Sequence, residues 1–89
     1  EHGFSKVAVL GAGMMGAGLA FICAKAGFQV VLRDIAADAV EKGLAHCHAQ
    51  AKKLRHLSEA ERTELLGRIT GTIDVADVAG ADLVIEAVF

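Results

Sequence analysis

Six residues near the start of the chain, Gly11-Ala12-Gly13-Met14-Met15-Gly16, place three glycines in the pattern G-x-G-x-x-G. The preceding run, Lys6 to Leu10, is rich in apolar and β-branched side chains, as is typical of a strand buried on both faces of a parallel sheet. The residues that follow, 14–26, are small, apolar and helix-forming, and Gly27 suits the position just after a helix end. The glycines therefore predict a tight turn from a buried strand into a helix.

The rest of the chain continues to alternate between strands and helices. A second apolar, β-branched run predicts another buried strand, and apolar residues spaced four and three apart then predict an amphipathic helix. Ser58 and Glu61 have the spacing of a capping box at the start of a short helix. This βαβα(α)β(α)β order predicts an α/β fold, the N-terminal part of a Rossmann-type doubly wound parallel sheet. The predicted strands are 6–10, 28–32, 69–73 and 83–88, and the predicted helices are 14–26, 38–54, 58–67 and 75–79.

Each glycine of the motif has its own physical reason. Gly11 makes the tight turn, Gly13 allows the backbone to approach a pyrophosphate that a Cβ would keep away, and Gly16 allows the helix to pack close to the sheet. The amides of Met14 and Met15 lie at the start of the helix, where unpaired N–H groups and the helix dipole attract an anion. The motif therefore predicts a dinucleotide-binding turn, with these five residues at the cofactor.

Asp34 supplies the acidic residue that this kind of site requires. It stands 18 positions after Gly16, at the end of the second predicted strand, where a carboxylate accepts hydrogen bonds from the adenosine ribose and repels a 2′-phosphate. The predicted cofactor is therefore NAD rather than NADP, although the neighbouring Arg33 would suit a 2′-phosphate. The alternative is that the glycines only make a turn and Asp34 only caps the next helix.

Composition excludes several other functions. The formal net charge is −2, aromatic residues make up 4% of the chain, and no basic stripe is present, so nucleic-acid binding is not expected. No apolar run reaches the roughly 18 residues of a membrane span. Cys23 and Cys47 have no CxxC spacing and are read as reduced thiols, which favours the cytoplasm and leaves the mitochondrial matrix and peroxisome open. His46 and His48 lack metal-ligand spacing, so no metal site is predicted.

Two segments carry a resemblance to a known family. Residues Val9 to Ala20 follow the pattern GxGxMGxGIA, with Leu19 where isoleucine is commoner, and residues Ala81 to Phe89 match ADLVIEAVFE without its last residue. Both patterns resemble the NAD-binding domain of 3-hydroxyacyl-CoA dehydrogenases. The resemblance spans about residues 5–89 and is strongest to the multifunctional fatty-acid oxidation α subunit, which joins an enoyl-CoA hydratase to this dehydrogenase.

The resemblance implies both a reaction and further site residues. In this family the positions of Met15, Asp34, Val88 and Phe89 contact NAD, and hydride passes to NAD from C3 of a 3-hydroxyacyl-CoA during fatty-acid β-oxidation. The family's catalytic histidine and glutamate lie downstream of the residues present, so no catalytic residue is assigned here. Acyl-CoA would bind through the missing part, and a thiolase subunit would be a partner if the parent enzyme is multifunctional.

Eighty-nine residues make at most one small domain. The interpretation is a partial NAD-binding domain over residues 1–89, with residues 1–4 as a linker remnant, cut from a longer oxidoreductase and inactive by itself. A stand-alone Rossmann-type nucleotide-binding module without catalysis is the alternative. A sheet that lacks its later strands would also expose an edge through which copies of the chain could associate.

Overall fold

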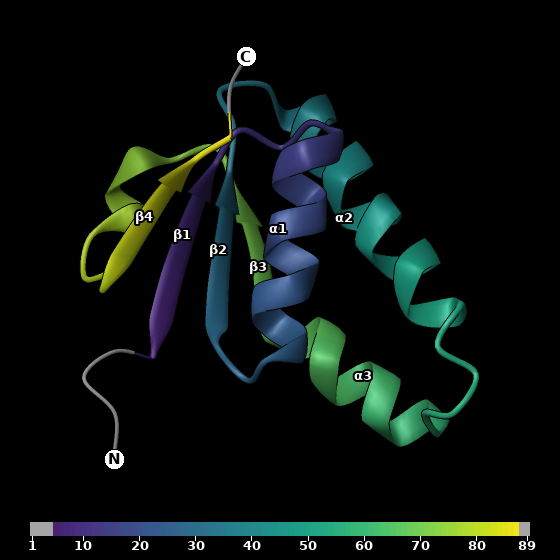
Figure 1. Ribbon diagram of the computed structural model, residues 1–89. Helices are drawn as coiled ribbons and strands as arrows, with labels where there is room; N and C mark the ends of the chain where they lie inside the picture. The colour runs from purple at the N-terminus through teal and green to yellow at the C-terminus, as the bar shows by residue number, and fades with distance from the viewer. Residues whose placement is uncertain (1–4, 88–89) are drawn as a thin grey trace.

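The computed structural model describes residues 5–87 and contains one parallel sheet with helices on its faces (Figure 1). The strands pair in the order β3-β2-β1-β4. This arrangement confirms the predicted α/β class and the N-terminal part of a Rossmann-type sheet. The elements are β1 (Lys6–Leu10), α1 (Met14–Lys25), β2 (Gln29–Arg33), α2 (Ala37–Lys52), α3 (Glu59–Gly67), β3 (Ile69–Thr72), the 3₁₀ helix η1 (Val75–Val78) and β4 (Leu83–Glu86).

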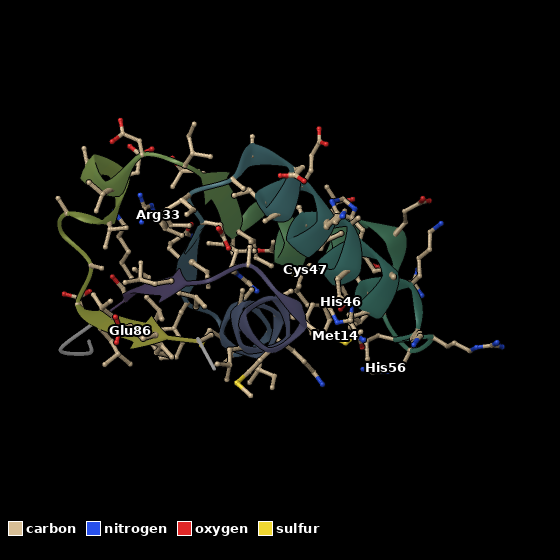
Figure 2. All side chains as sticks on the ribbon, turned by 90° about the horizontal axis from the view of Figure 1, so that it is seen from above. Met14, Arg33, His46, Cys47, His56 and Glu86 are labelled. Carbon is tan, nitrogen blue, oxygen red and sulfur yellow. The ribbon has the colours of Figure 1, made fainter. Side chains whose placement is uncertain are left out.

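The two faces of the sheet are covered differently. Helices α1, α2 and α3 lie on one side, and the connection from β3 through η1 to β4 crosses the other (Figures 1 and 2). Val7 and Val9 of β1 and Val30 and Leu32 of β2 are almost completely buried and form the core with α1 and α2. The interiors of the central strands, residues 7–10 and 30–32, are apolar because both faces of these strands are covered.

Local sequence signals explain where the helices begin and end. Ser58 and Glu61 form the predicted capping box, in which the Ser58 hydroxyl accepts from the Glu61 amide and the Glu61 carboxylate accepts from the Ser58 amide. Helix α1 ends at Lys25, and the chain turns away at Gly27, whose φ of 106° is favourable only for glycine. The Phe28 amide donates back to the Cys23 carbonyl at 3.1 Å, which satisfies a carbonyl at the helix end.

Several predicted boundaries differ from those observed by one or two residues. Strand β2 begins at Gln29 because the Phe28 amide still belongs to the end of α1. Helix α2 ends at Lys52, so Leu54 packs against the core from the following turn. Strand β4 ends at Glu86, two residues before the predicted end, and residue 88 lies outside the described range. None of the helices in residues 5–87 is both long enough and apolar enough to cross a membrane.

Candidate dinucleotide-binding site

The carboxyl ends of β1, β2 and β4 meet at one edge of the sheet, the upper edge in Figure 1. The glycine turn leaves β1 at this edge, and Asp34 follows β2 there. In a parallel sheet all strands point the same way, so the segments after them converge. Such an edge is the usual ligand site of an open α/β sheet.

The glycine turn has the geometry that the motif predicts. Gly11 has a φ of 106°, and its amide donates to the Arg33 carbonyl at 2.8 Å. Gly13 is the N-cap of α1 and has a φ of −68°, and a Cβ built on it would meet no atom of the chain within 4 Å. The surface above Gly13 is therefore open for a ligand to approach the backbone.

Gly16 has a different role from Gly13. A Cβ at Gly16 would overlap the Gly11 carbonyl oxygen and would lie 3.4 Å from the Ala87 Cβ. The absence of a side chain therefore lets the first turn of α1 lie against the turn that precedes it and the chain after β4.

Backbone amides at the start of α1 face the open edge. The helical hydrogen bonds of α1 include the one from the Ala17 amide to the Gly13 carbonyl at 2.8 Å. Met14 and Met15 come before Ala17 in the first turn of α1. Their amides therefore have no helical carbonyl four residues back to which they could donate. The side chains of Met14 and Met15 are 75% and 50% exposed, so neither packs in the core. These amides fit a phosphate group.

The Asp34 carboxylate binds backbone amides on two sides. Oδ2 accepts from the Ala12 amide at 2.9 Å, and Oδ1 accepts from the amides of Ile35 at 2.7 Å and Ala36 at 3.3 Å. The Ala12 amide is the main reason that the pKa of Asp34 lies below its ordinary value, and the Ile35 and Ala36 amides and the Arg33 charge act in the same direction. Partial desolvation opposes them. Asp34 is therefore a carboxylate at neutral pH.

A cavity of about 290 Å³ lies beside this carboxylate. Its volume suits a part of a nucleotide rather than a whole dinucleotide. Glu86 and Arg33 come from the strands on either side of β1, as the view from above shows (Figure 2). Arg33 Nε donates to the Ile73 carbonyl at 3.3 Å, which directs this side chain toward the β3–η1 connection. The cavity is lined by Leu10, Gly11, Arg33, Asp34, Ile35 and Glu86.

Ile35 is a candidate site residue that the sequence analysis did not single out. Its side chain is 80% exposed at the cavity beside Asp34. A lone isoleucine in a sequence looks like a core residue, and only its position immediately after Asp34 distinguishes it. Glu86 belongs to the segment that resembles the dehydrogenase family, and the sequence leaves open whether it contacts the cofactor or only ends a strand. In the structure it lines this cavity.

The structure thus brings together six of the eight predicted cofactor residues, which are Gly11, Gly13, Met14, Met15, Gly16 and Asp34. Val88 and Phe89 lie outside the described residues.

Among residues 5–87, the other polar groups do not form a second site of this kind. Within the described part of the chain no three His, Cys, Asp or Glu side chains cluster as metal ligands would. His46 and Gln50 lie within 3.4 Å of each other on α2, and Cys47 is buried between α1 and α2 (Figure 2). A larger cavity, about 530 Å³, lies between α2 and α3 and is lined by residues such as His48, Lys52 and Arg62. It has no residue in common with the glycine turn.

A parallel sheet, a glycine turn at the start of α1 and an acidic residue after β2 define the class of dinucleotide-binding α/β domains. Comparison with known sequences identifies the family. The family described as "3-hydroxyacyl-CoA dehydrogenase, NAD binding domain" matches residues 6–89. The chain belongs to this family, whose cofactor is NAD.

Relatives of known sequence and structure agree with this assignment. A 3-hydroxybutyryl-CoA dehydrogenase from Bradyrhizobium diazoefficiens is 42% identical over 84 residues, which cover 91% of this chain and 29% of that protein. The crystal structure of (S)-3-hydroxybutyryl-CoA dehydrogenase from Ralstonia eutropha superposes with a TM-score of 0.91 at 38% identity, covering 97% of this chain and 31% of that one. The chain therefore spans about a third of the length of these relatives.

The dehydrogenase part of multifunctional enzyme 1 from C. elegans also has this fold. It matches with a TM-score of 0.79 over 99% of this chain and 20% of its own. At 23% identity this likeness concerns the fold alone.

Proposed function

We propose that this chain is the NAD-binding segment of a 3-hydroxyacyl-CoA dehydrogenase, and that the complete protein oxidises 3-hydroxyacyl-CoA to 3-oxoacyl-CoA in fatty-acid β-oxidation. The observation that carries the proposal is the open surface at Gly13, which lies at the same sheet edge as the Asp34 carboxylate. The family match supports the choice of NAD. NAD, when bound, would accept the hydride, and the segment present would hold and orient it.

Each part of the site has a distinct task in this proposal. The open backbone at Gly13 and the amides of Met14 and Met15 would bind the pyrophosphate. Each carboxylate oxygen accepts up to two hydrogen bonds, so Oδ2 of Asp34, which accepts only the Ala12 amide, keeps one lone pair that would accept from a ribose hydroxyl. Ile35 would cover one face of the adenine with apolar surface.

NAD should bind in preference to NADP because of the charges at the cavity. Asp34 is anionic, and Glu86 adds a second carboxylate to the same lining. Arg33 is the only cation among the described residues that line this cavity, and its guanidinium also donates to the Ile73 carbonyl. A 2′-phosphate would therefore meet two carboxylates and one partly engaged cation.

The partners and compartment of the complete protein follow from the same proposal. Acyl-CoA would bind through residues outside this segment, and a thiolase subunit would join if the complete protein is multifunctional. The free thiols of Cys23 and Cys47 favour a reducing compartment such as the cytoplasm. The segment by itself would bind nucleotide without catalysing oxidation, and Val88 and Phe89 would complete the NAD contacts.

The experiment is calorimetric titration of the 89-residue chain with NAD and with NADP. We expect NAD to bind more tightly than NADP. Gly13→Ala should lower the affinity for NAD by about tenfold or more, because the methyl group of the alanine would occupy the space of the pyrophosphate. Gly67→Ala is the matched control, since a Cβ there also meets open space but lies far from the edge.

Circular dichroism of both variants would show whether the fold is retained. Absence of NAD binding by the unmodified chain would overturn the proposal. If a folded Gly13→Ala variant bound NAD as tightly as the unmodified chain does, the placement of the pyrophosphate at Gly13 would be overturned.

A further inference from the structure

Ala12, the second residue of the glycine turn, is held by groups distant in sequence. It is 3% exposed, and its amide donates to Asp34 Oδ2 at 2.9 Å across 22 residues. The adjacent Gly11 amide donates to the Arg33 carbonyl at 2.8 Å. Two successive amides of the turn are therefore bound to the end of β2.

The same carboxylate also organises the start of α2. Oδ1 of Asp34 accepts from the amides of Ile35 and Ala36, and Ala36 is the N-cap of α2. The Asp34 amide donates to the Thr72 carbonyl at 3.2 Å, which anchors this residue to the end of β3. Asp34 is thus a rigidly placed acceptor for the Ala12 amide.

Helix α2 contacts Ala12 from a second direction. A Cβ at Gly43 would lie 2.8 Å from the Ala12 carbonyl oxygen and 3.2 Å from the Ala12 Cβ. Gly43 is buried, and its missing side chain leaves α2 directly against the turn. Ala12 therefore has little freedom to rotate, and the direction of its peptide groups depends on both contacts.

We propose that Asp34 is a positioning residue for the phosphate-binding turn, in addition to its contact with ribose. Its bond to the Ala12 amide holds the turn in the shape that presents Gly13 and the amides of Met14 and Met15 to the pyrophosphate. The Ala12 amide faces the carboxylate and takes no part in phosphate binding. This inference rests on the proposed function for its ligand, while the hydrogen bond itself is measurable without one.

The strength of this contact comes from the charge on its acceptor. A hydrogen bond to an ionised carboxylate is shorter and stronger than one between neutral groups. The same amide keeps the pKa of Asp34 low, so the charged acceptor persists at neutral pH. Loss of the carboxylate would leave the Ala12 amide, at a nearly buried residue, without this partner.

The test compares a ligand that has the ribose hydroxyls with one that lacks them. NAD has both ribose hydroxyls and a pyrophosphate, whereas 2′,3′-dideoxyadenosine diphosphate retains the pyrophosphate without those hydroxyls. If Asp34 positions the turn, Asp34→Ala lowers the affinity for both ligands, and the affinity for the dideoxy compound falls by about five- to tenfold. Glu41→Ala removes a carboxylate from an exposed position on α2 outside this cavity, and it controls for loss of negative charge.

Hydrogen exchange of single amides, followed by NMR, gives a readout that does not depend on a ligand. The Ala12 amide should exchange about tenfold faster or more in Asp34→Ala than in the unmodified chain or in Glu41→Ala. The amides of Val9 and Leu32 in the core strands should not change, which verifies the fold. Asp34→Asn keeps an oxygen acceptor, and its Ala12 amide should exchange at an intermediate rate.

Two results would overturn the inference. One is that Asp34→Ala lowers the affinity for NAD but leaves the affinity for the dideoxy compound unchanged, which would limit the role of Asp34 to its contact with the ribose. The other is unchanged protection of Ala12 in both Asp34 variants. If the unmodified chain binds neither ligand, the proposed function fails, and the exchange rate of Ala12 still decides the positioning role.

Discussion

The first turn of α1 lies so close to the end of β1 that a Cβ on Gly16 would overlap the carbonyl oxygen of Gly11. The obstructing atom belongs to the backbone of a turn whose Gly11 amide is bound to the Arg33 carbonyl. It therefore cannot move aside as the end of a flexible side chain would. This contact sets the distance between α1 and the sheet edge.

Gly16→Ala should consequently destabilise the fold by about 1–3 kcal/mol, the usual cost of overpacking, or by more if the turn cannot shift. Urea unfolding followed by circular dichroism measures the change. Gly18→Ala is the control, because a Cβ there meets no atom within 4 Å and alanine favours a helix over glycine. Equal stability of the two variants would show that the Gly16 contact is not restrictive.

The fold should become less stable on acidification, because carboxylates that accept hydrogen bonds from backbone amides become protonated. Asp82 Oδ2 accepts from the amides of Ser5 at 2.9 Å and Lys6 at 3.0 Å, and these bonds lower the pKa of Asp82 below its ordinary value. A carboxyl whose pKa is lower in the folded chain stabilises the fold above its unfolded pKa of about 3.9. That contribution is lost as pH falls from about 4 through the lower folded pKa.

The free energy of unfolding, measured in urea between pH 3 and pH 7, should therefore decrease below about pH 4. Asp82→Asn should be less stable at pH 7 and should show a smaller decrease. Glu41→Gln alters an exposed residue of α2 and should retain the dependence of the unmodified chain. An Asp82→Asn profile parallel to that of the unmodified chain would contradict the prediction.

The two cysteines should differ in reactivity. Cys47 is 1% exposed, and its Sγ donates to the Ala17 carbonyl at 3.4 Å, whereas Cys23 is only partly buried. Burial raises the pKa of both thiols. Because the thiolate is the reactive form, both should react slowly at pH 8, and Cys47 should react roughly tenfold more slowly than Cys23 or slower still.

The rates can be measured with a thiol reagent on Cys23→Ser and Cys47→Ser, each of which retains one cysteine. Addition of urea should bring the two rates together, because unfolding exposes both thiols. A faster reaction of Cys47 in the folded chain would show that α1 and α2 separate more readily than their packing indicates.

Strand β4 should promote association between copies of the 89-residue chain. It is an edge strand of the described sheet, and Leu83 and Val84 are 45% and 47% exposed. An unpaired strand edge with apolar side chains is a surface for pairing with another chain. We expect the sedimentation coefficient to rise with concentration, and Val84→Lys to reduce the rise.

Ile73→Lys provides the control for this experiment. Ile73 is 53% exposed but precedes η1, outside any strand, so its replacement should not affect edge pairing. A constant sedimentation coefficient of the unmodified chain across the whole concentration range would contradict the prediction.

Much of the fold was predictable because its signals are local. The capping box of Ser58 and Glu61 involves residues three apart, and the end of α1 depends on the conformation that Gly27 readily adopts. The apolar runs of β1 and β2 identify strands covered on both faces, whatever covers them. Such signals depend on neighbours within one helical turn or one strand, and the sequence displays them directly.

The amino-acid sequence by itself determined the alternation of strands and helices, the glycine turn and the presence of an acidic residue after β2. Only the tertiary structure decided that Asp34 accepts the Ala12 amide, that Gly43 leaves α2 against the same residue, and that Ile35 and Glu86 line one cavity. These contacts join residues that are 22 or more positions apart, such as Ala12 and Asp34, or residues that belong to different strands. They depend on the order and register of the parallel strands, which bring distant segments to one edge, and no local pattern of side chains specifies that order.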